Sequence, residues 1–298
     1  MKQIIAMNFL LFILFILFVI IIGIIPFFLL YGLSDFTRVM LYYVFGYRKK
    51  VVVENLTKSF PDKSTKEITK LSRKFYKNLS DVLIEGIKAF SMNKKQVRNR
   101  HKVMNAEIAD KYLDKGQSII ALPSHYTNWE WGTMSGGLFF KNKNIALYKP
   151  LNNKWVDRFV RWSRSKYGTE LASIYKTIET FEKNKDHNSI FILAADQSPS
   201  KSNRAVWVDF LGRETAFLYG PEKYAKKYDL PVLFVDIQRV KRGHYELTFS
   251  VITDHPGDMP DGEITRLYAQ KLEEVILNKP ENWLWSHRRW KLKKEDSK

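Results

Sequence analysis

The segment from Ser124 to Gly132 (SHYTNWEWG) carries the side chains best suited to acid–base chemistry. His125 and Glu130 are five positions apart, and on a regular helix that step of about 500° separates two side chains by roughly 140°. They can meet if His125 lies in the turn after a strand and Glu130 lies in the first turn of the next helix. A carboxylate on one imidazole nitrogen fixes the tautomer and leaves the other nitrogen to accept a proton. The spacing therefore indicates that His125 is a candidate general base supported by Glu130.

The sequence also allows purely structural roles for these residues. Thr127 and Glu130 match the Thr-x-x-Glu pattern of a capping box, which would make Glu130 a helix-starting residue and His125 an ordinary turn residue. A second polar cluster, Asp196-Gln197, follows another apolar run. Asp196 is either a site residue or the N-cap of a helix.

The elements that must position these residues alternate between strands and helices. Strands are predicted at 117–123, 144–148, 189–195, 230–238 and 245–252. Helices are predicted at 64–90, 154–167, 221–228 and 263–277. This alternation predicts an α/β fold, with an open mixed sheet flanked by helices. Chemistry gathers at the strand ends of such sheets, and both polar clusters follow apolar runs.

The N-terminal segment is apolar enough to enter a membrane. No charged residue lies between Lys2 and Asp35, and Phe9–Leu30 is almost wholly Phe, Leu, Ile and Val. About 20 such residues cross the hydrocarbon core. A secretory signal has a shorter apolar region and an Ala-x-Ala site, which is missing here, and a buried helix of a soluble domain is the remaining alternative. We therefore expect one transmembrane helix within an anchor of residues 1–35, followed by a catalytic domain of residues 36–298.

Charge predicts the side of the membrane and the class of partner. Basic residues follow the apolar segment, which places the rest of the chain in the cytoplasm by the positive-inside rule. They are Arg38, Arg48, Lys49 and Lys50. The whole chain has 49 Lys and Arg against 31 Asp and Glu, a formal charge of +18. Nucleic acid, anionic lipid and an acidic protein are all compatible with that charge, but no nucleic-acid-binding motif is present, and an anchored basic domain fits anionic headgroups better.

Several classes of enzyme lack their defining residues. The 298-residue chain has no cysteine, which excludes disulfide scaffolds, Cys-ligated metal sites and a cysteine nucleophile. Ser124 is not in a Gly-x-Ser-x-Gly elbow, so a serine hydrolase is not expected. Neither His-Glu-x-x-His nor Gly-x-x-x-x-Gly-Lys occurs, so zinc-peptidase and P-loop functions have no support. No metal site is predicted.

The His-x-x-x-x-Glu box resembles the catalytic box of lysophospholipid-acyltransferase-type enzymes, and more narrowly that of the lipid A biosynthesis acyltransferases. Further blocks resemble that family in the same order along nearly the whole chain. They are YRKKVVVENLTKSFPDKS (47–64), YKPLNN (148–153), RSKYG (164–168), AADQSP (194–199), VDFLGRETAF (208–217) and NWLWSHRRWK (282–291). The likeness implies a glycerolipid acyltransferase-like fold.

The resemblance also implies a reaction: transfer of a fatty acyl chain from acyl carrier protein to a hydroxyl of an anionic glycolipid, the lipid A precursor, at the inner membrane without a cofactor. His125 would deprotonate the hydroxyl, and Glu130 would orient His125 and balance its charge. Arg164 would be the family's arginine, with Arg161 as the fallback. Further supporting residues would be Asp196, Gln197, Arg288 and Arg289, the two arginines either holding phosphate or covering a helix end.

Two other functions fit part of the same pattern. One is an acyltransferase of the same superfamily acting on a glycerolipid, a phosphoinositide mannoside or an aminolipid. The other is an anchored basic lipid-binding protein without enzymatic activity. An enzyme needs His125 and Glu130 together, whereas a binding protein would tolerate the loss of either.

Overall fold

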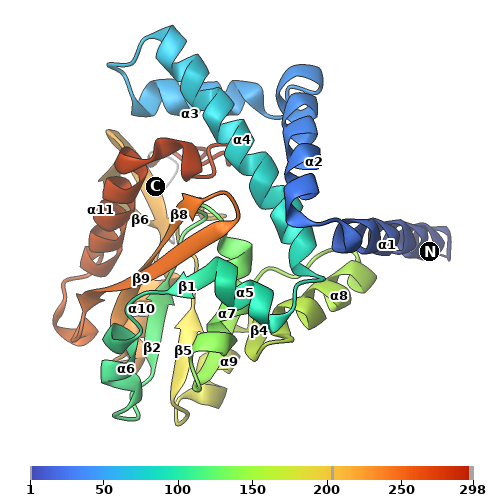
Figure 1. Ribbon diagram of the computed structural model, residues 1–298. Helices are drawn as coiled ribbons and strands as arrows, with labels where there is room; N and C mark the ends of the chain where they lie inside the picture. The colour runs from blue at the N-terminus through green and yellow to red at the C-terminus, as the bar shows by residue number, and fades with distance from the viewer. Residues whose placement is uncertain (1, 203–204, 295–298) are drawn as a thin grey trace.

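A seven-stranded mixed sheet forms the centre of the computed structural model, which describes residues 2–202 and 205–294 (Figure 1). The strand order is β1 (His101–Val103), β9 (His244–Thr253), β8 (Val232–Lys241), β2 (Ile119–Leu122), β5 (Ser189–Ile192), β3 (Lys143–Tyr148), β4 (Thr169–Ser173). All neighbours pair in parallel except β8 and β9. The predicted α/β class and mixed sheet are confirmed.

Helices cover both faces of this sheet. They are α3 (Lys49–Ser59), α4 (Thr65–Ala89), α5 (Lys94–Arg100), α6 (Glu107–Leu113), α7 (Trp129–Phe139), α8 (Lys154–Ser165), α9 (Thr177–Asn184), α10 (Gly220–Tyr228) and α11 (Glu263–Asn278). Successive residues of a strand point to opposite faces. Ile120 and Leu122 of β2 accordingly join one buried apolar cluster, while Ile119 and Ala121 join another on the opposite face. A separate antiparallel pair is formed by β6 (Ala205–Phe210) and β7 (Arg213–Leu218).

The apolar N-terminal segment forms two helices rather than one. Helix α1 (Lys2–Ile24) ends before Pro26, which is the N-cap of α2 (Phe27–Val39), and α2 leaves α1 in a new direction (Figure 1). Within α1, residues Ala6–Ile24 are long and apolar enough to cross a membrane. The one candidate span that was expected in this segment is therefore found, and it ends at Ile24 rather than at Leu30, because proline has no N–H to continue the helix and its ring clashes with the preceding turn.

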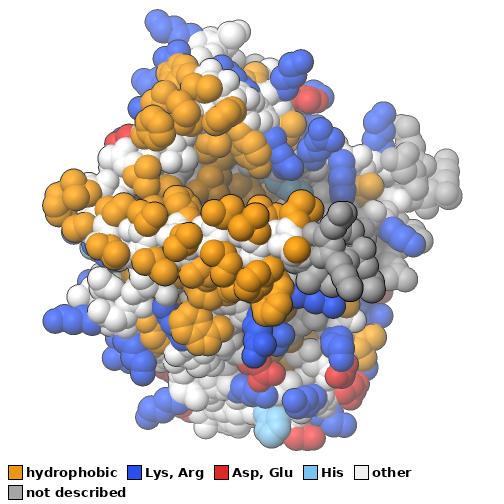
Figure 2. Space-filling view, turned by 90° about the vertical axis from the view of Figure 1, so that its right-hand side faces the viewer, with side chains coloured by type: hydrophobic (Ala, Val, Ile, Leu, Met, Phe, Trp, Pro, Cys, Tyr) orange, Lys and Arg blue, Asp and Glu red, His pale blue; other side chains and the backbone are white. Residues whose placement is uncertain are grey.

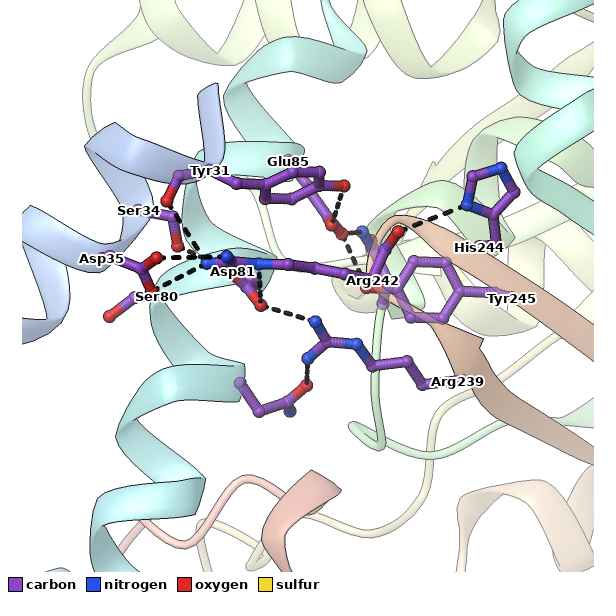
Figure 3. A network of polar contacts seen from close by, with 12 residues as sticks. Tyr31, Ser34, Asp35, Ser80, Asp81, Glu85, Arg239, Arg242, His244 and Tyr245 are labelled. Atoms are coloured by element: carbon purple, nitrogen blue, oxygen red, sulfur yellow. Dashed lines mark hydrogen bonds and ion pairs between the residues drawn. The ribbon is translucent and has the colours of Figure 1, made fainter. Parts of the chain in front are cut away.

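A buried polar network fixes α2 to α4 and to the β8–β9 turn (Figure 3). Asp81 of α4 has no exposed surface and accepts hydrogen bonds from Arg239 at 2.5 Å, from Arg242 at 2.6 Å and from Ser34 at 2.5 Å. Arg242 also pairs with Asp35 at 3.0 Å. The buried carboxylate of Asp81 therefore compensates charge on both arginines, and Asp35 adds a second partner for Arg242.

Asp81→Ala is expected to lower the thermal midpoint of the detergent-solubilised protein by about 10 °C. Removing one partner of a buried ion pair costs about 3–5 kcal/mol, because the remaining charges are left without compensation. The matched control is Glu54→Ala, which removes an exposed pair with Lys58 and should cost less than about 1 kcal/mol. Equal midpoints for the two variants would contradict a stabilising role of this network.

Candidate active site

Two neighbouring strands bring the predicted polar clusters together. β2 and β5 are adjacent and parallel, with Ile119 opposite Ile190, so their carboxyl ends lie at the same edge of the sheet. His125 lies in the loop after β2, and Asp196 follows β5. Residues 71 apart in sequence thus become direct neighbours.

Asp196 is the carboxylate that holds the imidazole of His125. Its Oδ1 lies 2.6 Å from Nδ1 of His125, and its Oδ2 accepts the backbone N–H of His125 at 2.9 Å. The indole N–H of Trp283 donates to the same Oδ2 at 3.0 Å. The expectation that Glu130 is the carboxylate on the imidazole of His125 is not met. Glu130 lies in the first turn of α7, and its carboxylate pairs with Arg164 instead.

The electrostatics of the His125–Asp196 pair keep the proton on Nδ1 of His125. Burial lowers the pKa of His125, but the charge and hydrogen bond of Asp196 outweigh it, and the pKa is raised above the usual 6.5. Burial raises the pKa of Asp196, but the charge of His125 and three hydrogen bonds outweigh burial, so the pKa of this carboxyl is held below its usual value. Since Asp196 accepts the proton on Nδ1, Nε2 is the nitrogen that can accept a proton from a substrate. About a fifth of the His125 side chain is exposed.

Glu130 forms a bidentate ion pair with Arg164 of α8. Nη2 of Arg164 lies 2.7 Å from Oε1 and 2.6 Å from Oε2 of Glu130, and Nε lies 3.0 Å from Oε2. The charge of Glu130 also acts in the direction of raising the pKa of His125. Of the two predicted arginines, Arg164 is therefore the one at this carboxylate, while Arg161 is exposed.

Glu130 is not part of a capping box. The N-cap of α7 is Asn128, whose side-chain oxygen accepts the N–H of Trp131 at 3.1 Å. Thr127 has a positive φ of 53°, and its hydroxyl donates to the carbonyl of Ile237 at 2.7 Å. The capping-box explanation from the sequence is wrong because this hydroxyl is used by β8 rather than by the helix.

Residues that the sequence analysis did not single out hold the start of α7. Glu85 of α4 has no exposed surface and accepts from the amide of Asn128 at 2.7 Å and from the hydroxyl of Tyr245 at 2.6 Å. The indole of Trp131 donates to the Glu85 carbonyl at 3.0 Å. Asn128 was detectable as a favourable N-cap residue, whereas the contacts of Glu85 and Trp283 depend on distant segments.

Close approach of two glycines sets the distance between α7 and the end of α8. A Cβ built on Gly137 of α7 would lie 2.3 Å from the carbonyl oxygen of Tyr167 and 2.6 Å from the carbonyl carbon of Gly168. Any larger residue must therefore push the backbone of the α8–β4 turn away. Because Glu130 belongs to α7 and Arg164 to α8, this contact helps to position their ion pair.

Gly137→Ala is expected to destabilise the protein by about 1–3 kcal/mol through overpacking and to reduce activity more than stability alone explains. The matched control is Gly32→Ala, since nothing lies within 4 Å of a Cβ at that position of α2. Thermal midpoints and initial rates of both variants test this expectation. A Gly137→Ala protein as stable as the control would show that the turn moves without cost.

The remaining predicted residues differ in their surroundings. Gln197 is half-buried beside Asp196, and Arg288 is exposed. Arg289 is buried, donates to the carbonyl of Ala216 at 2.6 Å and lies 4.3 Å above the ring of Phe217, and burial lowers its pKa to about 10. The charge of Asp196 acts in the opposite direction and raises the pKa of Arg289. In the ranges 2–202 and 205–294, no group of three or more His, Asp or Glu side chains is arranged to hold a metal ion.

Comparison with known proteins identifies the family of the chain. The profile of the family described as bacterial lipid A biosynthesis acyltransferase matches residues 2–292. A lipid A biosynthesis lauroyltransferase of Escherichia coli (strain K12) is 22% identical over 250 residues, which cover 83% of this chain and 80% of that protein. The chain therefore belongs to the bacterial lipid A biosynthesis acyltransferase family and is an enzyme that transfers acyl groups in lipid A biosynthesis.

Proposed function

We propose that this enzyme transfers a fatty acyl chain from acyl carrier protein to a hydroxyl of a lipid A precursor, with His125 as the general base. The observation that carries the proposal is the contact of 2.6 Å between His125 and the buried Asp196 at the shared edge of β2 and β5. This contact supplies a base with a fixed tautomer. The Glu130–Arg164 ion pair supports the site from the side of α7 and α8.

The proposed reaction needs no covalent enzyme intermediate. Nε2 of His125 takes the proton of the acceptor hydroxyl, and the oxygen attacks the carbonyl carbon of the thioester. The tetrahedral intermediate collapses with cleavage of the carbon–sulfur bond, and the thiolate takes the proton from the imidazolium. Asp196 stabilises the imidazolium throughout. Glu130 holds Arg164 by Nε and Nη2, so the N–H groups of Nη1 are the donors that we assign to the substrate.

We also propose the location of the reaction. The enzyme works at the inner membrane with its catalytic domain, residues 36–298, on the cytoplasmic side, and residues 1–35 serve as its membrane-binding segment. The apolar stretch of α1 fits attachment to a membrane, and the basic residues after it fit the cytoplasmic side. A formal charge of +18 suits both an acidic carrier protein and a phosphorylated glycolipid.

The donor is tested by comparing acyl carrier protein with coenzyme A as the carrier of the same acyl chain. Because opposite charges steer the encounter, we expect acyl carrier protein to give the higher kcat/KM, and we expect the advantage to shrink as salt rises to ~0.5 M, where charges are screened within a few ångströms. Mass spectrometry of the acylated product identifies the acceptor. Equal efficiency of both donors at every salt concentration would instead favour the glycerolipid alternative.

Glu130→Gln is expected to reduce the rate of acyl transfer substantially, because it removes the charge that pairs with Arg164. Arg164→Ala should lose a similar amount, and the double variant should be little worse than either single variant, since residues acting as a unit are not additive. The control is Glu170→Gln, which affects an exposed pair with Lys143 and should keep the wild-type rate. Additive losses would show that Glu130 and Arg164 act independently.

A further inference from the structure

Helix α1 lies along the catalytic domain instead of projecting from it. The less exposed positions of α1 recur mostly at three- and four-residue steps, which places them on one stripe. They are Asn8, Phe12, Phe15, Ile16, Val19, Ile22 and Gly23. From Asn8 to Ile22 this stripe is about 21 Å long at 1.5 Å per residue. A helix that contacts the domain along one stripe is a different arrangement from a free membrane span.

Contacts with two helices of the domain hold this stripe. At one end, Phe12 packs on Trp155 of α8 with ring centroids 6.1 Å apart, and the amide of Asn153 donates to the carbonyl of Asn8 at 2.9 Å. In the middle, Phe15 packs edge-on against Phe159 at 5.8 Å. At the other end, Ile22 has no exposed surface.

A lysine fixes the C-terminal end of α1 to α4. The ammonium group of Lys88 donates to the carbonyls of Ile22 at 3.2 Å, Gly23 at 2.6 Å and Ile25 at 2.9 Å. These carbonyls lie at the end of α1, where they lack partners within the helix. The docking is therefore anchored by polar contacts as well as by aromatic packing.

The opposite stripe of α1 is apolar and exposed. Leu14 is 54% exposed, Ile21 58% and Ile24 77%. A helix that is apolar all round needs an apolar environment on every side. Helices α4 and α8 supply this environment on one side of α1. The exposed side of α1 requires another apolar environment.

The exposed apolar surface continues beyond α1, and we call the whole surface the apolar face. It includes side chains of α1, of α2, of the adjoining π-helical turn η1 (Met40–Val44) and of α8. Its members are Leu10, Leu14, Leu17, Ile21, Ile24, Phe28, Leu29, Phe36, Val39, Tyr43, Val44 and Trp162. Figure 2 shows a hydrophobic band running across this side of the molecule, with further hydrophobic side chains above and below it.

Positive charge borders the apolar face. Beside α2, a groove is lined by basic residues and two threonines, with no acidic residue among them. The basic residues are Arg38, Lys66, Lys70, Arg73, Lys74 and Lys77. A lipid bilayer with anionic headgroups offers both an apolar interior and negative charge at its border. A second protein copy would need to bury this large apolar face and also neutralise the basic groove, and the +18 charge of each copy opposes that.

Charges on α8 argue against a transmembrane orientation of the docked helix. Lys154, Arg158 and Arg161 are exposed on α8, which packs against the N-terminal half of α1. If α1 crossed the hydrocarbon core while docked, these residues would enter it, at about 2.5–3.5 kcal/mol for each charge near the centre. An orientation along the membrane surface leaves them at the level of the headgroups.

We propose that α1, α2 and η1 lie along the surface of an anionic bilayer, with the apolar face immersed and α1 remaining docked on α4 and α8. Interfacial helices are buried about 5–10 Å deep, which is the depth that we expect for the apolar face. The N-terminus then stays on the same side of the membrane as the catalytic domain. This arrangement differs from the single span expected from the hydropathy of the sequence, and it does not depend on the proposed acyl donor or acceptor.

Single-cysteine labelling of the full-length protein tests this arrangement, because the native chain has no cysteine. Leu14→Cys, Phe36→Cys and Trp162→Cys, each carrying a fluorescent label, are reconstituted in phosphatidylglycerol–phosphatidylethanolamine vesicles at low protein density. The control is Lys185→Cys, an exposed position after α9. We expect lipids with a quencher near the headgroup to quench the first three labels strongly, and to leave the control unquenched.

The position of the N-terminus supplies an independent measurement. In vesicles whose Lys185→Cys label is accessible from outside, Lys2→Cys at the N-terminal end of α1 should react with a membrane-impermeant thiol reagent from the same side. Reaction of Lys2→Cys only from inside, or a Leu14 label quenched best at the bilayer centre with Phe36 and Trp162 labels in water, would establish a single span and overturn the proposal. Protection of Phe36 and Trp162 labels from both water and lipid, with cross-linking between copies, would overturn it in favour of a dimer.

Discussion

His125→Ala is expected to reduce the rate of acyl transfer by about 10²–10⁴-fold at saturating substrates, which is the usual contribution of general-base catalysis. The loss follows from the geometry, because Asp196 occupies Nδ1 of His125 at 2.6 Å and leaves Nε2 as the base. Initial rates with acyl carrier protein as donor measure the effect.

The control for this variant is His255→Ala, since His255 is exposed near the C-terminal end of β9. It should retain the wild-type rate. Thermal midpoints of both variants confirm folding. A folded His125→Ala enzyme with a rate close to that of the wild type would remove the proposed mechanism altogether.

Asp196→Asn is expected to lower the rate of acyl transfer by a factor similar to that of His125→Ala, and also to change the pH profile of the rate. In the proposed mechanism the active form of His125 is neutral, and this form is lost as pH falls through the raised pKa of His125. In the wild type the acid limb of the rate should therefore lie above pH 6.5. The variant lacks the charge that raises this pKa, so its acid limb should move to lower pH while its maximum rate falls.

The pH profile separates catalytic support from mere stabilisation of the loop. A structural role of Asp196 would lower the amount of folded enzyme without moving the acid limb. The double variant with His125→Ala should be little worse than His125→Ala alone, because the two residues act as a unit. An unchanged acid limb in a folded Asp196→Asn enzyme would contradict the proposed pairing.

Local pattern in the sequence is sufficient to predict most of the elements near the site. The helix predicted at 64–90 is α4, and its start is confirmed by a capping box between Ser64 and Glu67. The strand predicted at 117–123 is β2, whose four residues are all buried. The strand predicted at 189–195 is shorter, since β5 ends at Ile192. These predictions succeed because periodicity and capping act over a few residues.

Short and polar elements were missed for the same reason. The helices α5 and α6 have seven residues each, which is too short for a clear apolar period. The edge strand β4 has only five residues, of which two are buried. The hairpin of β6 and β7 does not belong to the main sheet at all. Their stability comes from neighbours in the fold rather than from their own pattern.

The sequence by itself determined the chemical types at the site and the apolar character of the N-terminus. Only the tertiary structure decided that Asp196, rather than Glu130, holds His125, and that Arg164 rather than Arg161 binds Glu130. Both contacts join segments that are distant in sequence, through the adjacency of β2 and β5 and the packing of α7 on α8. Spacing along the chain specifies which residues share one element, but the order of strands and the packing of helices depend on the whole core. The same reason applies to α1, whose length permits a membrane span while its contacts with α4 and α8 place it along the domain.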